Sequence, residues 1–230
     1  MSFQIAMDGP VAAGKGTVAR LTAQRLNLLY VDTGAMYRVT ALLALRNNIS
    51  FEDENALVKI IQASKMEMRN PTDAEKDGRL TTVLLNGEDV SWEIRTEKVS
   101  ANSSKVAALK MVRQELVKKQ QAIATAQNVV MEGRDITFRV LPDAQLKIFL
   151  TASDETRAKR RQAELQSKGQ DVTFEEVYKD LVERDKRDME RAVDPLHITK
   201  DAWVIDTSEL SINEVVDLIV SKAQNVQQKT

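Results

Sequence analysis

The chain has 230 residues, and its 33 basic and 34 acidic side chains give a formal net charge of −1. This balance argues against a general nucleic-acid binder, which carries a basic surface. The sequence has no cysteine and one histidine, His197, which excludes disulfide frameworks, cysteine zinc sites, thiolate nucleophiles and histidine metal clusters.

Length and hydropathy indicate one globular domain outside a membrane. No run approaches the roughly 20 apolar residues of a membrane span. The first residues lead directly into a predicted strand over residues 3–7, which leaves no room for a signal peptide. We therefore expect a cytoplasmic, monomeric protein with no membrane or nucleic-acid partner, large enough for one α/β domain with insertions.

A glycine-rich loop follows the strand and precedes a predicted helix over residues 15–27. Strand, glycine loop, lysine and helix are the context of a phosphate-binding P-loop. Glycines let backbone N–H groups turn toward an anion, the helix N-terminus points its free N–H groups there, and Lys15 adds a full charge. The loop therefore predicts a nucleoside triphosphate site. It comprises Gly9, Pro10, Val11, Ala12, Ala13, Gly14, Lys15, Gly16 and Thr17.

The end of this loop departs from the strict P-loop pattern. That pattern places Ser or Thr directly after the lysine, but here Gly16 follows Lys15 and Thr17 comes one residue later. The Gly-Lys-Gly-Thr ending resembles the nucleoside monophosphate kinases. A turn that binds nothing is the alternative, and the flanking strand and helix disfavour it.

Alternating strands and helices continue along the chain. Predicted strands span residues 28–31, 128–132, 146–150 and 202–206. Predicted helices span residues 34–47, 52–61, 97–127 and 211–223, and two helices joined near 167–169 span 154–192. Ser211 and Glu214 fit a capping box. The alternation predicts a doubly wound parallel sheet with ligands at the carboxyl ends of its strands.

Residues 64–95 interrupt this alternation. Lys65 to Arg69 alternates apolar and polar side chains, and Thr81 to Leu85 leads into Asn86-Gly87, a strong hairpin signal. The segment predicts a small antiparallel β insertion.

Several further motifs together resemble bacterial cytidylate kinase. They are residues 32–38 (DTGAMYR), 86–90 (NGEDV), 94–96 (IRT), 132–135 (EGRD) and 184–193 (RDKRDMERAV). The resemblance runs from about residue 3 to about residue 220. It implies a P-loop NTPase fold that phosphorylates CMP and dCMP with ATP and Mg²⁺. It also implies one kinase domain over 1–230, with a core of about 1–63, 96–152 and 193–230, an NMP-binding insertion of about 64–95, and a helical lid with substrate-contacting helices of about 153–192.

The chemistry of phosphoryl transfer explains why such a site is rich in arginine. Transfer needs positioning and charge neutralisation, and guanidinium groups grip phosphate with two parallel donors. The acceptor is itself an anionic phosphate oxygen, so no strong general base is required. The resemblance implies Lys15, Arg134, Arg157 and Arg191 as the catalytic residues. It implies Arg157 and Arg161, four residues apart on one helix face, as lid residues that close over the ATP phosphates beside the P-loop.

The resemblance also implies how CMP is held. The implied residues are Thr33, Tyr37, Arg38, Ser104, Arg113, Arg134, Asp135, Arg184, Asp188 and Arg191. Arg38, Arg134 and Arg191 would contact the phosphate or the transferred group, with Thr33 nearby. The cytosine edge would meet Ser104, Arg113 and Asp135, because a carboxylate accepts from an exocyclic amine and an arginine donates to a carbonyl. Tyr37, Arg184 and Asp188 would face the sugar.

Departures and alternatives remain open at this point. Thr137 stands where the family usually has Gly, and Val11 to Ala13 replaces the usual Ser and Gly. Asp8, Asp32 and Glu132 could hold Mg²⁺ through water, but the metal ligands stay unassigned. The rival enzymes are adenylate, uridylate and shikimate kinases. The rival from another class is a nucleotide-binding switch, which would form no phosphorylated product.

Overall fold

A five-stranded sheet forms the centre of the computed structural model, which describes residues 2–75, 77–167 and 169–228. Its strands run parallel in the order β2-β6-β1-β7-β8. They are β1 (Gln4–Asp8), β2 (Leu29–Asp32), β6 (Val129–Gly133), β7 (Leu146–Thr151) and β8 (Trp203–Asp206). Because β1 lies in the middle, the P-loop that follows it is placed at the centre of the carboxyl edge. The predicted doubly wound parallel sheet is confirmed.

Helices cover both faces of this sheet. Alternate strand residues point to opposite faces, so Ile5 and Met7 pack in one apolar cluster and Ala6 in another. The first cluster includes α1 (Lys15–Leu26) and α8 (Ile212–Gln227), and α8 begins with the predicted Ser211–Glu214 capping box. The second includes α2 (Thr33–Arg46), α3 (Glu54–Ala63), α4 (Glu97–Ala108) and α5 (Lys110–Ala126).

The helical pattern predicted for about residues 97–127 is confirmed, but it breaks at Leu109 into α4 and α5. Leu109 is extended, with φ −81° and ψ 122°. The break leaves carbonyls at the end of α4 without helical partners, and the Nη1 of Arg113 donates to the carbonyl of Ala107 at 3.1 Å. A side chain from the next helix therefore stabilises the interruption.

The predicted antiparallel insertion is confirmed as a three-stranded sheet. Its strands are β3 (Met66–Arg69), β4 (Thr82–Leu85) and β5 (Glu88–Asp89). Asn86 and Gly87 form the predicted hairpin with φ values of 52° and 87°. Positive φ at both central residues matches the right-handed twist of the flanking strands.

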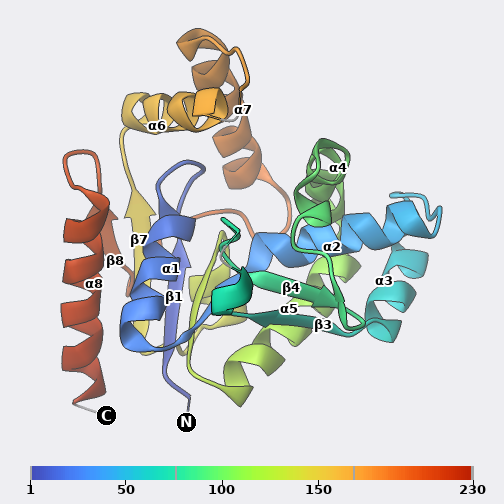
Figure 1. Cartoon of the computed structure of the whole chain (residues 1–230), viewed down its shortest axis with the longest axis horizontal. Coiled ribbons are helices and arrows are strands. Elements are labelled where there is room, and N and C mark those ends of the chain that lie inside the picture. Colours follow the sequence, from blue (N-terminus) through green and yellow to red (C-terminus); the bar gives the residue numbers. More distant parts are fainter. Residues whose placement is uncertain (1, 76, 168, 229–230) are drawn as a thin grey trace.

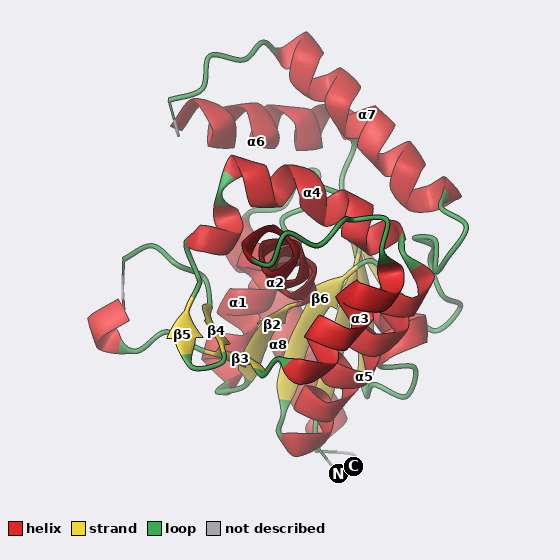
Figure 2. Ribbon diagram, turned by 90° about the vertical axis from the view of Figure 1, so that its right-hand side faces the viewer, coloured by secondary structure: helices red, strands yellow, loops and turns green. Residues whose placement is uncertain are grey.

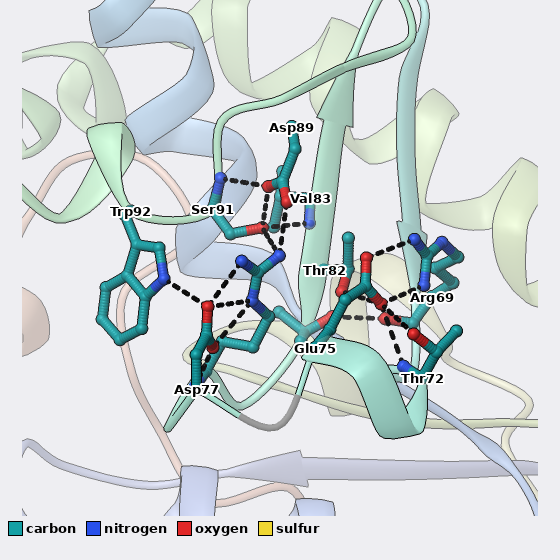
Figure 3. Close-up of polar contacts among 11 residues, drawn as sticks. Arg69, Thr72, Glu75, Asp77, Thr82, Val83, Asp89, Ser91 and Trp92 are labelled. Atoms are coloured by element: carbon teal, nitrogen blue, oxygen red, sulfur yellow. Dashed lines mark hydrogen bonds and ion pairs between the residues drawn. The ribbon is translucent and has the colours of Figure 1, made fainter.

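Ion pairs hold the long connection between β3 and β4 (Figure 3). Arg69 binds both carboxylate oxygens of Glu75, each at 2.6 Å. Arg79 pairs with Asp77 at 2.7 Å and also with Asp89, while the indole of Trp92 donates to Asp77 at 2.8 Å. Bidentate pairs of this kind fix geometry, although exposure limits their contribution to stability.

Asn70 attaches the insertion to the edge strand of the central sheet. Its Oδ1 accepts from the Tyr30 N–H at 3.1 Å, and its Nδ2 donates to the Leu28 carbonyl at 2.9 Å. Because β2 is the edge of the sheet, these backbone groups have no strand partner on that side. One side chain therefore satisfies two backbone groups and docks the insertion.

We expect Asn70→Ala to lower the free energy of unfolding by about 1–3 kcal/mol, because it removes the partners of a backbone donor and a backbone acceptor. Denaturant unfolding followed by circular dichroism measures the change. Asn102→Ala is the matched control, since within the described part of the chain the Asn102 side chain donates only to the Lys98 carbonyl, on the exposed side of α4. Equal unfolding midpoints for the two variants would refute the anchoring role of Asn70.

A helical pair lies at the end of the molecule opposite the two chain termini (Figures 1 and 2). It consists of α6 (Asp154–Ser167) and α7 (Phe174–Glu190), as predicted for 154–192, although Lys168 in the predicted junction lies outside the described residues. Its buried apolar cluster contains only Ala158, Val177 and Leu181. So small a core makes this pair a candidate for local opening. No helix in the described residues has the length and apolar character needed to span a membrane.

Candidate active site

The P-loop wraps from the end of β1 to the start of α1. Gly9 has φ +153°, and a Cβ there would lie 2.0 Å from the carbonyl oxygen of Leu150, so only glycine fits. Gly14 is left-handed, with φ 85°, and is the N-cap of α1. The loop therefore presents the unpartnered N–H groups of the first helical turn at the carboxyl edge of the sheet.

Ala12 is the strained position in this loop. Its φ of 58° lies in the left-handed region, which costs an alanine about 1–2 kcal/mol relative to a right-handed conformation. The backbone nonetheless adopts this conformation without glycine. That the loop N–H groups are available to phosphate stays a prediction.

Lys15 is buried beneath the loop and carries a perturbed charge. Its Nζ donates to the Pro10 carbonyl at 2.7 Å. Burial, followed by the nearby charge of Arg134, lowers the pKa of the Lys15 ammonium from 10.5 to about 7. A bound anion would raise the pKa of Lys15 again, because a nearby negative charge favours the charged ammonium.

Arg157 contacts Val11 of the P-loop and is almost wholly buried. Its Nη1 donates to the Val11 carbonyl at 2.9 Å and pairs with Asp185 at 2.5 Å. The Val11 N–H in turn donates to Asp185 at 3.3 Å. An arginine of α6 and an aspartate of α7 thus hold both polar groups of one P-loop residue. Closure of Arg157 over ATP phosphates stays a prediction.

Two arginines converge near Asp32, which caps α2. Arg38 Nη1 lies 3.5 Å from the Asp32 carboxylate, and Arg95 Nη2 lies 3.6 Å from it. Both nitrogens are buried, and neither makes a hydrogen bond among the described residues. Buried donors without partners are costly, which fits a site that receives phosphate. Arg95 was not predicted as a site residue; its place in the 94–96 motif was the available signal.

A second group of cations surrounds the end of β6. Arg134 Nε donates to Asp188 at 2.8 Å. Loss of water contact and then the charge of Arg134 lower the pKa of Arg184. Burial and then Arg113 lower the pKa of Arg191, whose Nε donates to the Asp194 carbonyl at 2.7 Å. Burial and repulsion between neighbouring cations thus both lower the pKa values of Arg184 and Arg191.

The predicted base-reading residues form a buried ion pair. Arg113 is 1% exposed and pairs with Asp135, and its Nε lies 3.2 Å from Asp194. Burial raises the pKa of the Asp135 carboxyl, and Arg113 opposes that rise. The ring of Tyr37 lies 5.6 Å from the Arg113 guanidinium. The structure therefore brings Tyr37, Arg113 and Asp135 together beside Arg191.

Four further predicted residues differ in their burial and in their partners. The Thr33 hydroxyl donates to the Glu132 carbonyl at 2.8 Å. Ser104 is exposed on α4, and the described residues give it no hydrogen bond to Arg113 or Asp135. Arg161 Nη1 pairs with Glu164 at 2.7 Å, and Thr17 is half-buried in the first turn of α1. Their predicted roles require rearrangement or contacts that a nucleotide would supply.

The acidic residues near the strand ends are engaged with the protein. Both Asp8 carboxylate oxygens accept hydrogen bonds from residues 136–137. Asp32 accepts from the Ala35 N–H at 3.2 Å, and Glu132 accepts from the Tyr30 hydroxyl at 3.3 Å. The described part of the chain holds no group of three or more acidic or histidine side chains arranged for a metal.

Comparisons with known proteins agree with this geometry. A family model described as cytidylate kinase matches residues 5–225. The cytidylate kinase of Bacillus pumilus is 45% identical over 227 residues, which cover 99% of this chain and 98% of that protein. The cytidylate kinase of Caldanaerobacter subterraneus is 48% identical over 219 residues, covering 95% and 93%. An uncharacterized protein from Eubacterium ventriosum, 12% identical with a TM-score of 0.51 over 97% of this chain and 99% of that one, shares the fold. The chain belongs to the cytidylate kinase family.

Proposed function

We propose that this protein transfers the γ-phosphoryl group of ATP to CMP or dCMP, giving ADP and CDP or dCDP. The observation that carries the proposal is the gathering of Lys15, Arg134, Arg184 and Arg191 at the carboxyl edge of the sheet. Burial, and after it the charge of a neighbouring cation, lowers the pKa of Lys15, Arg184 and Arg191. Two polyanionic nucleotides placed end to end would relieve this repulsion.

The residues divide the reaction between two nucleotides. The P-loop N–H groups and Lys15 would bind the ATP phosphates, and Arg38, Arg95, Arg134 and Arg191 would hold the CMP phosphate and the transferred group. A CMP phosphate oxygen forms the new bond to the γ-phosphorus as the bond to the ADP oxygen breaks. The enzyme's part is alignment and charge neutralisation, so a general base is unnecessary.

Mg²⁺ would be held mainly by the ATP phosphates and water. The donor set supports this, because both carboxylate oxygens of Asp8 already accept hydrogen bonds from residues 136–137 and the described residues hold no group of three or more acidic side chains arranged for a metal. Asp32 and Glu132 would be the acidic side chains that bind its water ligands. The ion would supply further neutralisation of phosphate charge.

The division into core, insertion and lid also belongs to this proposal. The insertion would help to bind CMP. Trp92 lies on the insertion and is 48% exposed, so its fluorescence would report movement of the insertion. The pair α6 and α7 would move as the lid, with its small core permitting the motion. A monomeric state and a cytoplasmic location stay predictions of the sequence.

We expect CMP and dCMP to be phosphorylated at least about 100-fold more efficiently than UMP, because uracil would place a carbonyl against Asp135 in a buried site. The test measures ADP release with Mg²⁺-ATP and each of CMP, dCMP, UMP, AMP and shikimate, and identifies the product by chromatography.

The same assay separates the alternatives. Preference for UMP, AMP or shikimate would overturn the base assignment. Slow ATP hydrolysis with no phosphorylated product would favour a nucleotide-binding switch. Asp135→Asn is the specificity control, because an amide can donate a hydrogen bond to the uracil carbonyl as well as accept one. We expect this variant to have a smaller ratio of kcat/KM for CMP to kcat/KM for UMP.

A further inference from the structure

A π-helical turn, Ile136–Val140, begins directly after Arg134 and Asp135. Its backbone bonds run from the Val140 N–H to the Asp135 carbonyl at 3.2 Å, and from the Leu141 N–H to the Ile136 carbonyl at 2.8 Å. The first N–H groups of any helical turn have no partner inside it. A turn of this type beside substrate-binding residues therefore needs an external acceptor.

Asp8 supplies that acceptor from β1. Its Oδ1 accepts from the Ile136 N–H at 2.9 Å, and its Oδ2 accepts from the Thr137 N–H at 2.8 Å and the Thr137 hydroxyl at 2.7 Å. Asp8 is 0% exposed and Thr137 is 1% exposed. Burial raises the pKa of the Asp8 carboxyl, and the bonds from Thr137 oppose the rise. Thr137 thus provides two of the three donors that stabilise this carboxylate.

This contact joins the two halves of the proposed site. Asp8 immediately precedes Gly9, the first P-loop residue, and Gly9 cannot shift freely because it packs against the Leu150 carbonyl. Thr137 follows Asp135 by two residues. The bond between them therefore ties the loop assigned to ATP to the segment assigned to CMP, through groups that are assigned to neither nucleotide.

We propose that Thr137 is a positioning residue whose hydroxyl, through Asp8, sets the placement of Arg134 and Asp135 relative to the P-loop. The inference rests on the proposed function of the two halves. In-line transfer depends on this relative placement, and an error of about 1 Å can reduce turnover roughly 100-fold. Each half can still bind its own nucleotide when the hydroxyl is removed.

The test compares Thr137→Val, which removes the hydroxyl at nearly constant volume, with Thr137→Ser, which keeps it. We expect Thr137→Val to lower kcat at saturating ATP and CMP by about 10-fold or more, with both KM values within twofold of wild type. Thr137→Ser should keep kcat within threefold. A purely structural role would not separate kcat from KM in this way or be rescued by serine.

Several results would overturn the inference. They are an unchanged kcat in Thr137→Val, a raised KM for either nucleotide with normal kcat, or a loss that serine does not restore. If Thr137→Val does not fold, Thr137→Ala decides the same comparison, with folding checked by circular dichroism. A wild-type protein without CMP-dependent product would refute the proposed function itself, whereas a change in Thr137→Val relative to active wild type bears only on the positioning role.

Discussion

Arg113→Met should destabilise the protein by about 3–5 kcal/mol and lower kcat/KM for CMP by about 100-fold. Arg113 is buried, and it pairs with Asp135 and Asp194 and donates to the Ala107 carbonyl that ends α4. Methionine replaces the aliphatic volume but leaves the Asp135 carboxylate buried without its main partner, which is the costly case. Thermal and denaturant unfolding measure the stability, and a CMP titration measures the activity.

The pH dependence of this loss has a defined sign. Burial already raises the pKa of Asp135 in the folded protein, and removal of Arg113 raises it further. Between pH 3.8, the ordinary carboxyl pKa, and the raised pKa of Asp135, the folded variant therefore binds more protons than the unfolded chain. Its stability is therefore present at low pH and is lost as pH rises through the folded pKa. The deficit relative to wild type should be smaller at pH 5 than at pH 8.

A second substitution separates stability from recognition. Arg113→Met combined with Asp135→Asn removes the unmatched charge and should recover part of the lost stability. It should not recover CMP phosphorylation, because neither of the groups proposed to read the cytosine edge remains. Recovery of activity together with stability would show that Arg113 acts on CMP only through folding.

The features predicted correctly from the sequence all depend on local chemistry. The Asn86-Gly87 turn requires two positive φ values, and the Ser211–Glu214 box satisfies helix N–H groups three residues away. Short continuous apolar runs, such as residues 129–131, similarly mark strands of a parallel sheet that is buried on both faces. Such signals are complete within a few residues, so they are readable before any tertiary structure exists.

The features that were missed depend on distant partners. The break at Leu109 is stabilised by Arg113, although nothing in the intervening residues resembles a helix stop signal. Thr137 and Asp8 are 129 residues apart, and Arg157 and Val11 are 146 apart. Arg95 reaches the Asp32 region only after the insertion has folded back. Motifs located the candidate site residues, while their connections required three-dimensional contacts that have no periodic signature.

Lys15→Met should reduce kcat by about 100- to 1,000-fold, the usual effect of removing one donor aimed at charge in a buried catalytic site. Methionine nearly matches the length of the lysine stem and packs in the same volume, so the P-loop should keep its conformation. Steady-state assays of CDP formation measure the loss. Arg25→Met is the matched control, because Arg25 lies at the far end of α1 in an exposed pair with Asp217.

The perturbed pKa of Lys15 gives an independent measurement on the wild-type protein. A pKa of about 7 leaves the side chain largely neutral at pH 8 before ATP binds. ATP phosphates favour the charged form, so binding at pH 8 should take up a proton. Calorimetric titrations in buffers of different ionisation enthalpy report this uptake. At pH 6 the lysine is already charged and the uptake should be small, and in Lys15→Met it should vanish at both pH values.

The same shift predicts how the free protein responds to pH. Between about pH 7 and the ordinary lysine pKa of 10.5, the unfolded chain binds more protons at this position than the folded protein does. The contribution of Lys15 to stability therefore increases as pH rises through that window, and charging the buried ammonium is unfavourable below it. Lys15→Met should be more stable than wild type at pH 6, by a margin that shrinks toward pH 9. If Lys15→Met were inactive and also less stable than wild type at pH 6, this would contradict the interpretation that the buried Lys15 ammonium destabilises the free protein and is stabilised by bound phosphate.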